Sequence, residues 1–100
     1  MKRRRHVLCA LALLSGCDVG AAESACEGFA RTLCERTTAC DESIRLGVCL
    51  TNVEQELRCD AVYATTGDVE RCSLDVSEMS CDDVKNALLP ATCGDVEFLR

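Results

Sequence analysis

The sequence predicts a small all-α domain, a disulfide-rich bundle of three to four short helices. Apolar side chains and cysteines recur at helical spacing in four segments after residue 24. No run alternates apolar and polar residues long enough to indicate a sheet. Only three aromatic side chains follow residue 17, and tryptophan is absent. Packing alone leaves so short a chain marginal, so we expect covalent cross-links to support it.

The cysteines supply that support. Cys9 and Cys17 lie at the amino terminus, and eight more are spread over the remainder at uneven spacing. An even set in a small exported chain predicts four disulfides, each stabilising the fold by about 2–4 kcal/mol. The predicted bridge residues are Cys26, Cys34, Cys40, Cys49, Cys59, Cys72, Cys81 and Cys93.

The first two helices are predicted over residues 25–39 and 43–58. Ser24 and Glu27 have capping-box spacing at the start of the first. Asp41 and Ser43 are candidate caps for the second, with Thr51 as a competing start that would divide it into two pieces.

Two shorter helices are predicted over residues 67–79 and 81–89. Ser80 and Asp83 repeat the capping-box spacing at the start of the last helix, and Pro90 is expected to end it. We expect the tail after Cys93 to be irregular.

Eight cysteines permit 105 pairings. If the first two helices form a hairpin that turns near Asp41, Cys34 and Cys49 stand level, and so do Cys26 and Cys59 to within a turn. These two bridges are therefore favoured. For the other four cysteines, Cys40–Cys81 with Cys72–Cys93 is only slightly preferred, and a local Cys81–Cys93 bridge is the main competitor.

The amino terminus has the pattern of an export signal. Four basic residues, 2–5, precede the uncharged apolar run Val7–Leu14. Eight residues are too few to span a membrane, but they suit the apolar core of a signal peptide. The run leads into Leu14-Ser15-Gly16-Cys17.

This tetrapeptide resembles the lipobox of bacterial lipoproteins, Leu-(Ala/Ser)-(Gly/Ala)-Cys, at every position. The resemblance implies that diacylglycerol is attached to the Cys17 thiol, that the signal 1–16 is removed, and that the new amino group is acylated, commonly with palmitate. Residues 17–23 would form the lipidated end and a tether, and residues 24–100 the domain. The alternative is an ordinary secretory cut after Ala21 or Ala22, which would release a soluble disulfide-rich inhibitor or toxin-like mini-protein.

Asp18, directly after Cys17, resembles an inner-membrane retention signal of enteric-type bacteria. Because that rule varies between bacterial groups, the choice between inner and outer membrane stays open. The cysteines on short helices, with Ser80-Cys81-Asp82-Asp83 and Leu89-Pro90-Ala91-Thr92-Cys93, also resemble uncharacterised small cysteine-rich helical lipoproteins of large-genome bacteria. That resemblance implies no activity.

Charge and composition argue against several function classes. Residues 17–100 carry seven basic and seventeen acidic side chains, a net charge of −10, which repels nucleic-acid phosphates. The single histidine, His6, would be removed with the signal. The remaining chain has no histidine, which excludes Ser–His and Cys–His nucleophile pairs. No cysteine pair has the two-to-four-residue spacing of a zinc site or a Cys-x-x-Cys redox motif.

Asp41-Glu42 and Asp82-Asp83 fall at expected helix starts, where capping explains them better than calcium binding. We therefore expect no catalytic residue, no metal and no cofactor. The sequence predicts a non-catalytic structural or recognition module, anchored to the cell-envelope membrane through lipid on Cys17. It would face the periplasm or the exterior and contact a protein or another envelope component.

Overall fold

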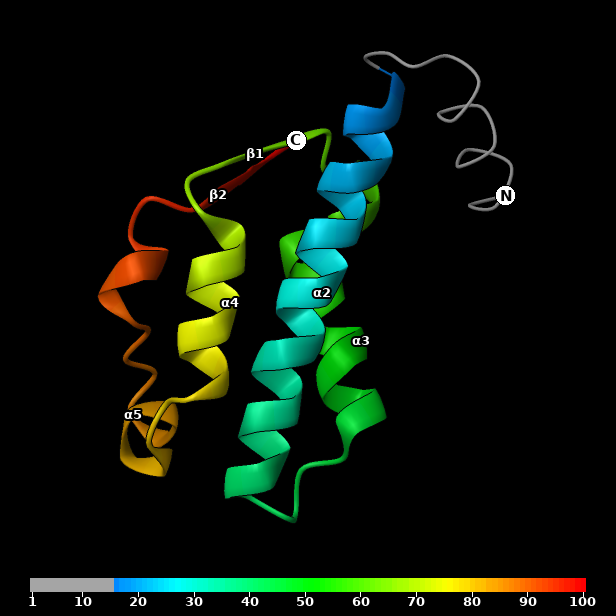
Figure 1. Ribbon diagram of the computed structural model, residues 1–100. Helices are drawn as coiled ribbons and strands as arrows, with labels where there is room; N and C mark the ends of the chain where they lie inside the picture. Colours follow the sequence, from blue (N-terminus) through cyan, green and yellow to red (C-terminus); the bar gives the residue numbers. More distant parts are fainter. Residues whose placement is uncertain (1–15) are drawn as a thin grey trace.

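The computed structural model describes the backbone of residues 16–100 and the side chains of residues 20–100. This part of the chain is a small helical bundle held by four disulfides (Figure 1). Its helices are α2 (Gly16–Cys40), α3 (Leu46–Leu57), α4 (Val69–Ser77) and α5 (Cys81–Lys85). Short 3-10 turns occupy Cys59–Ala61 and Ala91–Cys93. The predicted fold class is confirmed.

Helix α2 is the central element. Helix α3 packs against it as the returning arm of a hairpin, and α4 packs on its other side (Figure 1). Helix α5 lies near the carboxyl end of α2, to which it is linked by the Cys40–Cys81 bridge. The end of the bundle that carries α5 is called the distal pole below. The opposite end, where α2 begins, is the proximal pole.

Helix α2 begins earlier than predicted. The expected start at residue 25 is wrong, because the helix already runs from Gly16, and residues 17–23, expected to form a tether, lie within it. Residues 21–25 include three alanines and a glutamate, which favour helix, so Ser24 continues the helix instead of capping it. Ala22 is buried in this first part of α2, and the folded domain therefore begins before residue 24.

Helix α3 begins later than predicted, at Leu46, and runs unbroken past Thr51. Asp41 and Ser43 do not cap it. The Asp41 carboxylate instead accepts hydrogen bonds from the Ser43 amide at 3.0 Å and from the Ser43 hydroxyl at 2.6 Å. Short polar side chains commonly stabilise a turn in this way, and the turn takes up the residues expected in the first turn of the helix.

Helix α4 is two residues shorter than predicted at each end, and Asp68 caps it by accepting from the Arg71 amide at 3.0 Å. Helix α5 starts where expected, with the Ser80 hydroxyl accepting from the Asp83 amide at 3.1 Å. It ends at Lys85, before the predicted stop at Pro90. Ala87 lies in the left-handed region there, and the Leu88 amide donates back to the Asp83 carbonyl. This Schellman-type end closes the helix without proline.

A short antiparallel sheet was not predicted. Strand β1 (Ala64–Thr66) pairs with β2 (Glu97–Leu99), with Ala64 opposite Leu99. Three residues are too few to show a readable alternation, which explains why the sequence pattern missed it. The pairing brings the carboxyl-terminal tail to the proximal pole (Figure 1).

The core consists of two neighbouring clusters. One contains Ala22, Cys26, Cys59 and Val62, and the other Phe29, Cys72, Val76 and Met79. Leu57 and Phe98 pack against both clusters, and the rings of Phe29 and Phe98 lie 5.6 Å apart, tilted by 49°. The tail therefore completes the core as well as the sheet.

Candidate functional site

The disulfide framework is the most distinctive chemical feature of the described residues. Its bridges are Cys26–Cys59, Cys34–Cys49, Cys40–Cys81 and Cys72–Cys93, with Cα–Cα distances of 5.4, 5.7, 5.4 and 4.7 Å. All four distances fall in the normal range for disulfides. The two pairings favoured from the helical hairpin are confirmed, and so is the slightly preferred pairing of the other four cysteines.

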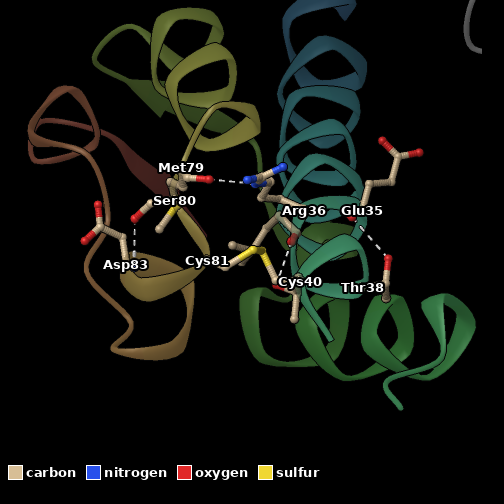
Figure 2. The surroundings of a disulfide bond; sticks show 10 residues. Glu35, Arg36, Thr38, Cys40, Met79, Ser80, Cys81 and Asp83 are labelled. Atoms are coloured by element: carbon tan, nitrogen blue, oxygen red, sulfur yellow. Dashed lines mark hydrogen bonds between the residues drawn. A yellow bond between two sulfur atoms is a disulfide. The ribbon is translucent and has the colours of Figure 1, made fainter. Parts of the chain in front are cut away.

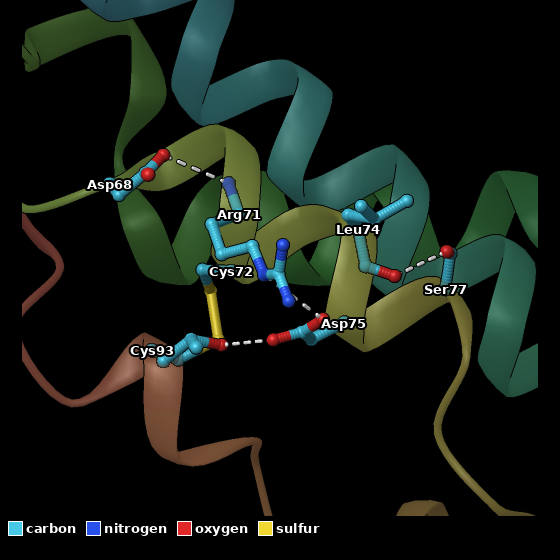
Figure 3. Close-up of polar contacts among 8 residues, drawn as sticks. Asp68, Arg71, Cys72, Leu74, Asp75, Ser77 and Cys93 are labelled. Carbon is cyan, nitrogen blue, oxygen red and sulfur yellow. Dashed lines mark hydrogen bonds and ion pairs between the residues drawn. A yellow bond between two sulfur atoms is a disulfide. The ribbon is translucent and has the colours of Figure 1, made fainter.

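Three of the four bridges have one cysteine in α2, and the fourth joins α4 to the tail. Cys34–Cys49 joins α2 to the first turn of α3, and Cys26–Cys59 joins α2 to the 3-10 turn that follows α3. Cys40–Cys81 fastens α5 to the last residue of α2 (Figure 2). Cys72–Cys93 fastens the tail to α4 (Figure 3). The Thr92 hydroxyl, next to this bridge, donates to the Asp75 carboxylate at 2.7 Å. The framework thus fixes helix placement more than any single apolar contact does.

Burial differs among the bridges. Cys26, Cys34 and Cys72 are fully buried, and Cys59 is 3% exposed. The core holds few large apolar side chains, and these disulfides fill space that such side chains would otherwise occupy. Cys40 is half-buried and Cys81 is exposed, so the bridge at the distal pole is open to solvent on at least one side.

The predicted lipid attachment point lies at the edge of the described residues. The backbone of Cys17 belongs to the first turn of α2, while its side chain and residues 1–15 are outside the described part. The eight bridge cysteines pair with one another, so none of them is bonded to Cys17. Within the described residues, no helix is both long enough and apolar enough to cross a membrane.

The acidic pairs singled out in the sequence take up structural positions. Asp82 and Asp83 lie in the first turn of α5, as predicted. Asp41 lies in the turn before α3, where the hydrogen bonds from the Ser43 hydroxyl and amide lower the pKa of its carboxyl group. Over residues 20–100, no group of three or more cysteine, aspartate, glutamate or histidine side chains is arranged to hold a metal ion.

Several polar contacts could not be predicted from the sequence. The Arg36 guanidinium donates to the Met79 carbonyl at 2.7 Å and so joins α2 to the end of α4 (Figure 2). At the other pole, the Arg100 guanidinium donates to the Leu57 carbonyl at 2.6 Å. Each contact joins residues that are 43 positions apart in the chain, and no local spacing signals such a pair.

The exposed large apolar side chains are scattered. Val48 lies on α3, Tyr63 precedes β1, Leu74 lies on α4, and Leu88 and Leu89 follow α5, all between 51% and 57% exposed. Only Leu88 and Leu89 are neighbours in the chain, and they stand at the distal pole. Isolated exposed apolar residues are normal on a soluble surface, so the Leu88-Leu89 pair is the more distinctive feature.

No protein-family model, curated protein or solved structure matches the chain.

Proposed function

We propose that this protein is a lipid-anchored, non-catalytic module of the bacterial cell envelope that acts in structure or recognition. The observation that carries the proposal is the closed set of four disulfides, which is typical of proteins outside the reducing cytoplasm. Because those eight cysteines form disulfides with one another, none of them competes for the Cys17 thiol, which the lipobox context marks for lipid attachment.

The position of α2 supports the lipobox cut over the ordinary secretory cut. A cut after Ala22 would remove a residue that is 5% exposed and packs with Cys26, Cys59 and Val62. A cut after Ala21 would start the chain within the same buried turn. Cleavage before Cys17 leaves this part of the helix intact.

The position of Cys17 in α2 also predicts how the bundle would be oriented on the membrane. Cys17 is the second residue of α2, and the helix is 25 residues long, so its axis measures about 37 Å at 1.5 Å per residue. Lipid at the proximal pole would set the bundle directly on the membrane and point the distal pole away from it. The exposed Leu88 and Leu89 would then face the envelope space, where a protein or another envelope component can reach them. The net charge of −10 over residues 17–100 favours a partner with basic residues.

The anchor is tested with variants of the two cysteines nearest the amino terminus, Cys9 and Cys17. Cys17→Ser is expected to lose membrane fractionation, and the membrane-purified protein is expected to have the mass of residues 17–100 plus diacylglycerol and an amide-linked acyl chain. Cys9→Ser is the matched control, since it removes a leader thiol outside the lipobox and should fractionate as the natural chain does. Retention of Cys17→Ser on the membrane, or a soluble product that starts at Ala22 or Glu23, would contradict the proposal.

The recognition role is tested separately by cross-linking the anchored protein in its own envelope. Cross-links from the amine of the exposed Lys85, next to this pair, are expected to reach one defined partner and to be lost in Leu88→Ser/Leu89→Ser. Val48→Ser is the control because Val48 is equally exposed on a different element. Equal cross-linking by both variants would argue against recognition at the distal pole.

A further inference from the structure

The Cys40–Cys81 bridge differs from the other three in solvent access. Each of the other bridges contains at least one cysteine that is at most 3% exposed. In Cys40–Cys81, neither residue is buried, and Cys81 is exposed (Figure 2). Because thiol–disulfide exchange requires direct approach to a sulfur, this bridge is the one that an external thiol reaches first.

A surface hollow of about 530 Å³ adjoins the bridge. Both of its cysteines line it, together with Ile44 and Val84 and the charged side chains of Asp41, Asp82 and Lys85. The volume is large enough for a small thiol to approach the sulfurs without moving the core. In each of the other bridges one cysteine is fully buried, and its partner is 3% exposed (Cys59) or half-buried (Cys49 and Cys93), whereas Cys81 is exposed.

The segment that this bridge fastens has little else to hold it. It runs from Ser80 to Ala91 between two firm attachments: Met79, which is buried and accepts from Arg36, and Thr92 with the Cys72–Cys93 bridge. Between these attachments no residue is buried, and Val84 is the one side chain that packs against the core cluster of Phe29. The segment includes α5 and the exposed Leu88 and Leu89.

We infer that Cys40–Cys81 is a thiol–disulfide exchange site that a dithiol opens selectively, releasing residues 80–91 from α2 while the other three bridges keep the bundle folded. The reductant is a dithiol of the class found in thiol–disulfide oxidoreductases or small dithiol compounds. Opening changes the orientation of Leu88 and Leu89, so the exchange acts on the surface that the distal pole presents.

The exchange is balanced without any further reactant. One thiolate of the dithiol attacks the Cys81 sulfur, a mixed disulfide forms, and the Cys40 sulfur leaves as a thiolate that takes up a proton. The second thiol of the dithiol loses its proton and attacks its own partner sulfur in the mixed disulfide. Cys81 is released as a thiol, and the dithiol becomes a cyclic disulfide.

The test uses the oxidised, exported protein in native buffer. It is exposed to a limiting amount of dithiothreitol, quenched with N-ethylmaleimide at successive times, and mapped by tandem mass spectrometry. We expect Cys40 and Cys81 to be alkylated together, about tenfold faster than any other cysteine, because access controls the exchange rate. Earlier alkylation of another pair, or equal rates for all eight cysteines, would overturn the inference.

A second measurement separates local release from general loosening. In Cys40→Ser/Cys81→Ser, amide exchange is expected to accelerate over residues 80–91 and to stay unchanged in α2 and α4. The matched control is Cys34→Ser/Cys49→Ser, which removes a bridge from the opposite side of α2 and should leave residues 80–91 as protected as in the natural chain. If the variant folds poorly, the natural protein alkylated at both Cys40 and Cys81 in the first experiment is measured instead. Unchanged exchange over residues 80–91 would overturn the inference.

Discussion

Gly67 lies where β1 leads into α4, with φ 76°, a conformation that side chains disfavour. A Cβ at this position would lie 2.5 Å from the Asp95 carbonyl oxygen and 2.8 Å from its carbon. The glycine therefore lets the start of α4 approach the tail closely.

We expect Gly67→Ala to lower the free energy of unfolding by about 2 kcal/mol or more, because backbone strain and the clash with Asp95 add. The change in the free energy of unfolding is measured by urea denaturation. Gly28→Ala is the control: it lies in α2 with open space around it, and should raise the unfolding free energy by about 0.5–1 kcal/mol. A Gly67→Ala variant as stable as the natural chain would refute the close approach.

Asp41 provides a pH prediction at the same scale. The hydrogen bonds from Ser43 lower its pKa in the folded state below the ordinary value of 3.8. The unfolded state therefore binds the proton more readily, and the contribution of Asp41 to stability is present above pH 3.8 and is lost as the pH falls through the folded-state pKa.

The expected measurement is a carboxyl titration by NMR, with a midpoint for Asp41 below 3.8. Ser43→Ala should raise that midpoint, because it removes the hydroxyl hydrogen bond, the larger of the two causes. A midpoint that does not move in Ser43→Ala would show that the turn does not hold the carboxylate.

At the scale of elements, the predicted start was right for α5 and wrong for α2, α3 and α4. Ser80 caps α5 as its spacing to Asp83 predicts, since both partners of the contact lie within four residues. The predicted end of α5 was wrong because Ala87 adopts a left-handed backbone conformation, which is unusual for alanine and which no local sequence pattern signals. The start of α2 was wrong because the capping pattern at Ser24 lies inside an alanine-rich segment that extends the helix.

Ala87→Gly should stabilise the end of α5. A left-handed alanine costs about 1 kcal/mol relative to glycine, so amide exchange at residues 86–88 should slow about fivefold. The control is Ala21→Gly, an exposed position in α2, where glycine is expected to destabilise the helix by about 1 kcal/mol. Faster exchange near residue 87 would contradict the Schellman-type end.

At the scale of the whole molecule, disulfides supply stability that larger domains obtain from an extensive apolar core. Four of the ten buried apolar residues in the described part are cysteines, and the remainder are chiefly alanine and valine with Phe29 and Met79. At about 2–4 kcal/mol for each bridge, the framework contributes as much as the usual net stability of a domain.

Complete reduction of all four bridges is therefore expected to unfold the domain at 25 °C. Circular dichroism after reduction and alkylation in denaturant, followed by removal of the denaturant, should show loss of most helical signal. The oxidised protein taken through the same denaturant cycle is the control and should refold. A reduced protein that still melts cooperatively would show that packing suffices.

The sequence by itself determined the all-α class, the presence of four bridges and the capping of α5, because each of these depends on spacing along the chain. Once the first two helices were assumed to form a hairpin, the pairings Cys26–Cys59 and Cys34–Cys49 also followed from helical rise. Only the tertiary structure decided the β1–β2 pairing, the place of Phe98 between two core clusters, the Arg36 and Arg100 contacts, and which bridge is exposed. The physical reason is that these features join residues tens of positions apart, and their free energy depends on which surfaces meet after the helices have packed.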